Sequence, residues 1–113
     1  MARTKLPDPL SRRHLLEAAL EPARAKALAE GYLARGREIE AIDFLAKAGD
    51  EAALVALENE AVVRGDVFLL RRVAQALGRE PGPERWRALA DAANQAGRQR
   101  DAESAIRLAA VDV

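Results

Sequence analysis

Residues 36–48 of the chain read GREIEAIDFLAKA, from Gly36 to Ala48. The glycine allows a tight reversal of the backbone, at a conformation that other residues reach only with strain. After it, Ala41, Leu45 and Ala48 follow the spacing of one face of a helix. The stretch therefore predicts a turn and then a helix that packs closely against the preceding one, with Ala41 as the small residue that lets the two axes approach.

Glycine and proline divide the rest of the chain in the same way, because both are costly inside a helix and useful at its ends. Pro9, Pro22 and Pro83 suit the first turn of a helix, and Asp50 and Asp66 suit N-caps. Glycines separate stretches of helical period at six positions: Gly36, Gly49, Gly65, Gly78, Gly82 and Gly97. The predicted helices span residues 9–19, 22–35, 37–48, 51–64, 67–77, 83–96 and 98–110.

The spacing of these predicted helices suggests three repeated hairpins. The connecting glycines Gly36, Gly65 and Gly97 are spaced as in stacked helix pairs. Two pairs place their residues at the offsets of one known pattern: Leu28, Ala29, Tyr32, Gly36, Ala41, Leu45 and Ala48 in the first, and Trp86, Leu89, Ala90, Gly97, Ala102, Ile106 and Ala109 in the last. Over residues 22–110 the chain resembles the tetratricopeptide repeat family. The resemblance implies an all-α, right-handed solenoid of three antiparallel hairpins that follows a short N-terminal helix.

The middle hairpin, residues 51–77, agrees less well with the pattern. Glu58 and Leu70 stand where small residues are expected. Either this unit is a diverged repeat, or the chain has a related helical-repeat fold with different stacking angles.

The sequence predicts a single domain with a basic N-terminal segment. Residues 1–21 form a basic arm and the short helix, and residues 22–113 form the helical-repeat domain. Arg3, Lys5, Arg12 and Arg13 against Asp8 give the first sixteen residues a net charge of +3.

In the resembled family the first helices of successive hairpins line a concave groove. The resemblance therefore implies a partner-binding groove made of three trios, each with members four and then three residues apart on one helix face: Lys26, Glu30 and Leu33; Val55, Asn59 and Val62; Arg87, Asp91 and Asn94. Such a groove, apolar in the middle and polar at its ends, suits an amphipathic helix or an extended peptide. A second interpretation of Val55 and Val62, as ordinary core residues, is equally open.

Composition excludes several kinds of chemistry. The chain has no cysteine, so disulfides, thiolate catalysis and cysteine-ligated zinc are excluded. His14 is the only histidine and is better explained as a solvated helix residue than as a base or a metal ligand. No phosphate-binding loop, nucleophile elbow or calcium loop is present in the sequence. We therefore expect no enzyme activity, no cofactor and no bound metal.

Function follows from architecture in this interpretation. We expect a protein-protein interaction adaptor that binds a peptide or helix of a partner protein, as a monomer or weak homodimer in the cytoplasm and without a membrane span. The balance of eighteen basic and eighteen acidic residues disfavours nucleic acid. Two alternatives remain open: a DNA-binding helix-turn-helix over residues 67–95, with Trp86 to Gln95 as its reading helix, and a self-associating scaffold.

Overall fold

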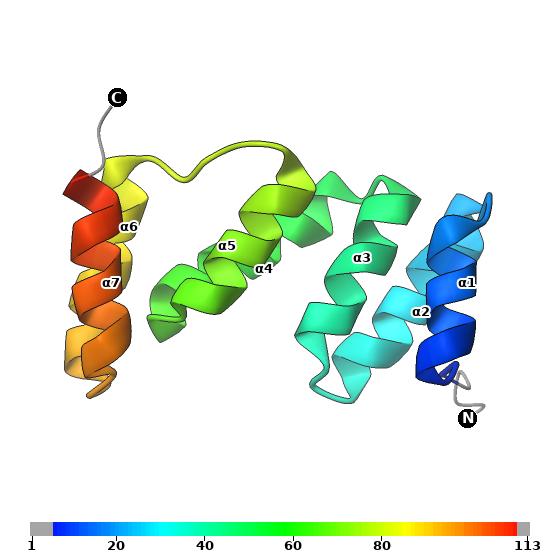
Figure 1. Cartoon of the computed structure of the whole chain (residues 1–113), viewed down its shortest axis with the longest axis horizontal. Helices are drawn as coiled ribbons and strands as arrows, with labels where there is room; N and C mark the ends of the chain where they lie inside the picture. The colour runs from blue at the N-terminus through cyan, green and yellow to red at the C-terminus, as the bar shows by residue number, and fades with distance from the viewer. Residues whose placement is uncertain (1–5, 111–113) are drawn as a thin grey trace. The chain divides into compact units, whose positions relative to one another are not determined.

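A computed structural model describes residues 6–110 of the 113-residue chain (Figure 1). Every regular element in this range is a helix, which confirms the all-α prediction. The helices are α1 (Pro9–Glu17), α2 (Pro22–Ala34), α3 (Glu38–Ala48), α4 (Glu51–Arg64), α5 (Val67–Leu77), α6 (Pro83–Gln95) and α7 (Gln99–Ala110). Residues 1–5 of the predicted basic arm and the final residues 111–113 lie outside the described range.

Local chemistry at the helix starts agrees with the sequence prediction. Pro9, Pro22 and Pro83 each occupy the first turn of a helix, where a missing amide hydrogen costs nothing. Asp66 caps α5, since its Oδ1 accepts a hydrogen bond from the Leu69 amide at 3.0 Å. Asp50 caps α4 by accepting from the Ala53 amide at 3.2 Å. Every helix therefore starts and ends within two residues of its predicted bounds.

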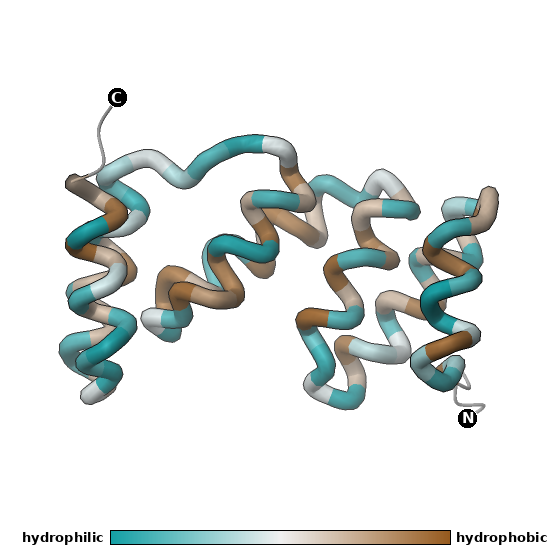
Figure 2. Tube along the Cα trace, viewed as in Figure 1, coloured by the Kyte–Doolittle hydropathy of each residue, from teal (hydrophilic) through white to brown (hydrophobic). Residues whose placement is uncertain are grey.

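Backbone contacts divide the chain into two units, Met1–Leu54 and Val55–Val113, and the division falls inside α4. Each unit has buried apolar residues of its own. Figure 2 shows apolar and polar residues alternating along the helices, as expected for amphipathic helices that each bury one face.

In the first unit, α2 and α3 pack together as a hairpin. Tyr32 of α2 and Phe44 of α3 are fully buried, and their rings stack with centroids 5.5 Å apart. The guanidinium of Arg37 lies 5.0 Å from the centre of the Tyr32 ring. Ala29 and Ala41, one from each helix, have no exposed surface. The predicted inward position of Tyr32 and the predicted packing role of Ala41 are both confirmed.

Helix α1 lies against α3 in the same unit. The Lys47 Nζ donates a hydrogen bond to the Ala18 carbonyl, just past the end of α1, at 3.2 Å. Arg12 of α1 and Glu40 of α3 form a long ion pair at 3.9 Å. A hydrogen bond from its own backbone amide, followed by the hydrogen bond and charge of Arg37 and the charge of Arg12, holds the pKa of Glu40 below its ordinary value. Polar contacts therefore attach α1 to the hairpin.

In the second unit, α6 and α7 form another hairpin. Trp86, Leu89 and Ala93 of α6 are buried, as are Ala102 and Ala105 of α7. The predicted inward position of Trp86 is thereby confirmed. Alanine on α7 opposite bulky residues on α6 lets the two helices approach, as the sequence pattern predicts.

The turn between α4 and α5 packs against α6. A Cβ atom on Gly65 would lie only 2.5 Å from the Cα of Ala93, so no other residue fits without movement of the backbone. Gly65 also has a φ of 71°, in the left-handed region. This close approach ties the α4–α5 connection to the α6–α7 hairpin. Pairing of consecutive helices through glycine turns is thus observed, whereas a solenoid of the tetratricopeptide type stays a prediction.

Candidate functional site

The sequence-predicted groove residues of the first unit all lie on α2. Lys26 and Glu30 are exposed, and Leu33 is half-buried. On this face of α2 the two charged side chains are therefore open to solvent, and the leucine is partly covered.

The other six predicted groove residues belong to the second unit. Val55 and Val62 of α4 are half-buried, and Asn59 between them is exposed but accepts a 2.7 Å hydrogen bond from Arg85 Nη1. The trio on α6 is exposed: Arg87, Asp91 and Asn94. None of the nine predicted residues lines any of the three hollows described below. Their role in binding stays a prediction.

Glu58, which interrupts the repeat pattern, has a structural role in the second unit. It lies on α4 with only 3% of its surface exposed. Its Oε1 accepts a hydrogen bond from Arg79 Nη2 at 3.0 Å and pairs with Arg85 Nη2 at 3.4 Å. Arg79 belongs to the segment that joins α5 to α6, and Arg85 belongs to the first turn of α6. A buried carboxylate thus pairs with an arginine at each end of the α5–α6 connection and holds both in place.

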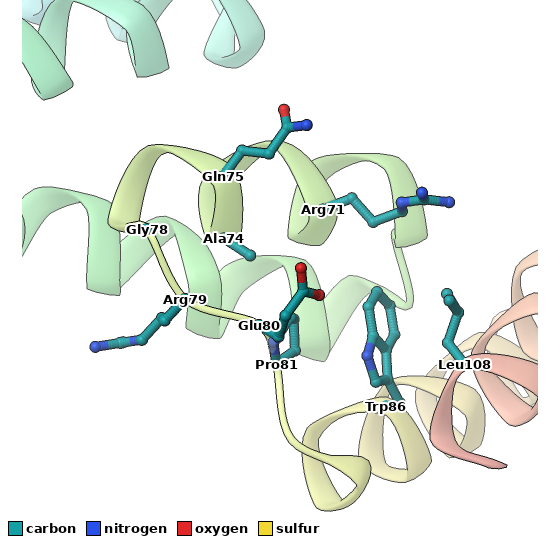
Figure 3. A pocket seen from close by; sticks show the side chains of 9 residues that line it. All are labelled: Arg71, Ala74, Gln75, Gly78, Arg79, Glu80, Pro81, Trp86 and Leu108. Carbon is teal, nitrogen blue, oxygen red and sulfur yellow. The ribbon is translucent and has the colours of Figure 1, made fainter. Parts of the chain in front are cut away.

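This connection forms one side of a hollow of about 320 Å³. Ala74, Trp86 and Leu108 form its apolar part, and Arg71 and Glu80 add charges. In Figure 3 the ring of Trp86 stands between Pro81 and Leu108, with the Glu80 carboxylate on one side of the ring and the Arg71 guanidinium on the other. Trp86 is almost fully buried, so the hollow reaches only part of its ring.

A second hollow of about 400 Å³ continues along α5. It is lined by Phe68, Arg72 and Asp101 among others, and it shares Arg71 and Gln75 with the first hollow. The two hollows therefore meet at Arg71 and Gln75, one helical turn apart on α5. We name the two hollows together the α5 groove.

Phe68 is the apolar residue that distinguishes the second hollow. Its surface is 62% exposed, although phenylalanine is among the residues most often buried. Phe68 therefore adds an exposed aromatic ring beside Arg71 and Arg72 in the second hollow.

Most charges of the α5 groove are paired within the chain. Arg79 binds Glu58, Asp101 accepts a 2.9 Å hydrogen bond from Arg98, and Arg72 donates to Gln75 at 3.3 Å. Arg71 and Glu80 differ, since neither has a hydrogen-bond or ion-pair partner among residues 6–110. These two groups are the ones available to a ligand.

Comparison with known proteins adds nothing to this geometry. No model of a protein family, no curated protein and no solved structure matched the chain.

A third hollow, of about 640 Å³, belongs to the first unit. It lies between α1, with Leu15 and His14, and the beginning of α2, with Arg24 and Leu28. Its walls mix apolar and polar side chains.

The described residues show two further properties relevant to function. Between residues 6 and 110, no three side chains of His, Cys, Asp or Glu gather closely enough to hold a metal ion. No helix in that part of the chain combines the length and the apolar character needed to cross a membrane.

The α5 groove was missed at the sequence level although part of its signal is visible there. Phe68, Arg71 and Gln75 are three and four residues apart, so they share one face of α5. Phe68 lies on the face of α5 opposite the buried residues Leu70 and Val73. An apolar residue at such a position is the feature of the sequence that indicates the groove. The contributions of Trp86 and Leu108 depend on how α6 and α7 fold back, which the local sequence does not specify.

Proposed function

We propose that the chain is a protein-binding module that holds a peptide segment of a partner protein in the α5 groove. One observation carries the proposal: the exposed ring of Phe68 and the largely buried ring of Trp86 line neighbouring hollows that meet at Arg71, a cation with no partner among residues 6–110. Aromatic side chains beside arginine are the residues that most often dominate the energy of protein interfaces.

The groove has the extent of a peptide rather than of one small molecule. It runs along α5 from Phe68, past Arg71 and Gln75, to the connection at Glu80. Apolar patches of this kind bind the side chains of a segment, while polar groups along the rim orient it. The Glu58 pairing with Arg79 and Arg85 supports the proposal, because a wall held in place before binding reduces the entropy lost on association.

This proposal retains the adaptor function expected from the sequence and places the partner on a second helix of a hairpin. The face predicted from the family resemblance, on α2, α4 and α6, is the competing location. Asn59 of that face is already engaged by Arg85, whereas Arg71 is free to bind.

The two alternative functions receive less support. The outward face of α6 carries Glu84 and Asp91 together with Arg87, and carboxylates there would repel DNA phosphates. The self-associating scaffold has only exposed apolar side chains such as Phe68 in its favour.

The test is a peptide selection followed by affinity measurements. A random peptide library is displayed and selected against the full chain, and selected peptides are titrated against wild type and the Phe68→Ala variant. We expect Phe68→Ala to weaken binding about tenfold, the typical effect of truncating an aromatic anchor. Because Phe68 is exposed, the variant should keep the helical circular dichroism of the wild type.

Val63→Ala is the matched control. Val63 is 73% exposed and lines none of the three hollows, so its truncation should leave the affinity unchanged. Equal losses for both variants, peptides indifferent to Phe68, or a selection that yields no binding peptide would each contradict the proposed function.

A further inference from the structure

The unpaired charges of the α5 groove constrain what can occupy it. Arg71 and Glu80 have no partner among residues 6–110, and they are not paired with each other. An occupant that covered these groups with apolar atoms would remove them from water without compensation, which is costly for a charged group. An occupant that covers both groups is therefore favourable only if it brings a carboxylate to Arg71 and a cation to Glu80.

These charges also have an order along the groove. Glu80 lines only the hollow that contains Trp86, whereas Arg71 lines both that hollow and the one that contains Phe68. In Figure 3 the Glu80 carboxylate lies to the left of the Trp86 ring, and the Arg71 guanidinium lies above the ring and to the right. An occupant lying along α5 thus meets Glu80 and Trp86 in one hollow, then Arg71 where the two hollows meet, and then Phe68.

We propose that the α5 groove selects a bipolar peptide segment, in which an apolar side chain over Trp86 is flanked by a basic residue facing Glu80 and an acidic residue facing Arg71. This inference rests on the proposed function and adds the chemistry of the partner. Arg71 suits the contact with the acidic residue of the peptide, since its planar guanidinium can bind a carboxylate with two parallel hydrogen bonds. The apolar side chain supplies affinity, and the two flanking charges fix the direction of the peptide.

The inference is tested by charge reversal at both ends. The random peptide library is selected separately against the full-length wild type, Arg71→Glu, Glu80→Lys and the variant with both changes. Wild type should enrich peptides with a base and an acid on opposite sides of an apolar residue. Arg71→Glu should lower the affinity for those peptides about tenfold, because the new carboxylate would face the acidic residue of the peptide. The double variant should enrich peptides of reversed polarity.

Arg87→Glu is the control for a general effect of charge. Arg87 is exposed on α6, belongs to the competing predicted face and lines neither hollow of the α5 groove. This variant should enrich the same peptides as the wild type. High salt should lower the affinity of the wild type for its selected peptides, since exposed charge pairs are screened. It should also reduce the loss of affinity caused by Arg71→Glu.

The possible failures separate the two proposals. If the selected peptides lose affinity on Phe68→Ala but show no charge order, or if Arg71→Glu binds them as tightly as wild type does, the bipolar segment is wrong and the protein-binding function stands. If Arg87→Glu changes the charge order and Arg71→Glu does not, the bipolar segment is assigned to the wrong face. If no peptide is selected, both proposals fail together.

Discussion

Among single residues, Tyr32 has an environment that suits its ring better than its hydroxyl group. The ring stacks on Phe44 and is covered by the Arg37 guanidinium. The hydroxyl oxygen, however, is the one buried side-chain nitrogen or oxygen atom between residues 6 and 110 that has no hydrogen-bond partner. A buried donor without a partner costs about 1–3 kcal/mol, so part of the stabilisation from the ring is lost again.

Tyr32→Phe should therefore raise the free energy of unfolding of the first unit by about 1 kcal/mol, because it removes the unpaired hydroxyl and keeps the stacked ring. The measurement is amide hydrogen exchange in α2 and α3, which reports on the first unit without interference from the second. Faster exchange in Tyr32→Phe than in wild type would show that the hydroxyl is stabilising.

Tyr32→Leu is the control for the ring. It removes the hydroxyl as well, but it also removes the stack with Phe44, and it should lower the free energy of unfolding by about 2 kcal/mol. The two variants together separate the contribution of the ring from that of the hydroxyl.

Among the elements, the α4–α5 turn depends most strictly on one residue. Gly65 and Gly78 share the same φ of 71°, but their surroundings differ. A Cβ on Gly65 would collide with the backbone of Ala93, while a Cβ on Gly78 would meet nothing within 4 Å. The pair therefore separates the cost of a left-handed backbone from the cost of a packing clash.

We expect Gly78→Ala to lower the free energy of unfolding of the second unit by about 1 kcal/mol, the ordinary cost of alanine at positive φ. Gly65→Ala should cost at least about 2 kcal/mol more, since α6 must move to admit the methyl group. Denaturant unfolding followed by the fluorescence of Trp86 measures both values. Equal costs would show that the turn does not press against α6.

The sequence predicts the helices well because their ends are decided locally. A proline in the first turn, an aspartate such as Asp66 at the N-cap and a glycine at the turn each act on neighbouring backbone groups. Their effects can be read without knowledge of the rest of the chain. Burial of Tyr32 and Trp86 is also predictable, since each occupies the inner position of a regular helical pattern.

The candidate site is less predictable because its parts are distant in the sequence. Glu58 departs from the repeat pattern in the sequence, and the structure explains it because Arg79 and Arg85 both bind its carboxylate. Its position is buried, as the pattern expects, but it is filled by a carboxylate that fixes the α5–α6 connection. The family resemblance implies a groove on the first helix of each hairpin and implies nothing about the exposed face of α5.

For the molecule as a whole, the two units divide the candidate features between them. The α5 groove belongs entirely to the unit Val55–Val113, since Phe68, Arg71, Trp86 and Leu108 all lie within it. The proposed binding therefore requires nothing from α1, α2 or α3. The competing face, by contrast, includes Lys26 and Glu30 of the first unit, so the location of bound peptide distinguishes the two assignments.

The most direct test is a ¹H–¹⁵N correlation spectrum of the full chain recorded while a selected peptide is added. Trp86 is the single tryptophan, so its indole N–H gives one identifiable signal. We predict that this signal and the amide signals of α5 from Phe68 to Gln75 shift on binding, while those of Lys26 and Glu30 do not. Binding that shifts Lys26 and Glu30 and leaves the Trp86 indole signal unchanged would contradict the assignment of function to the α5 groove.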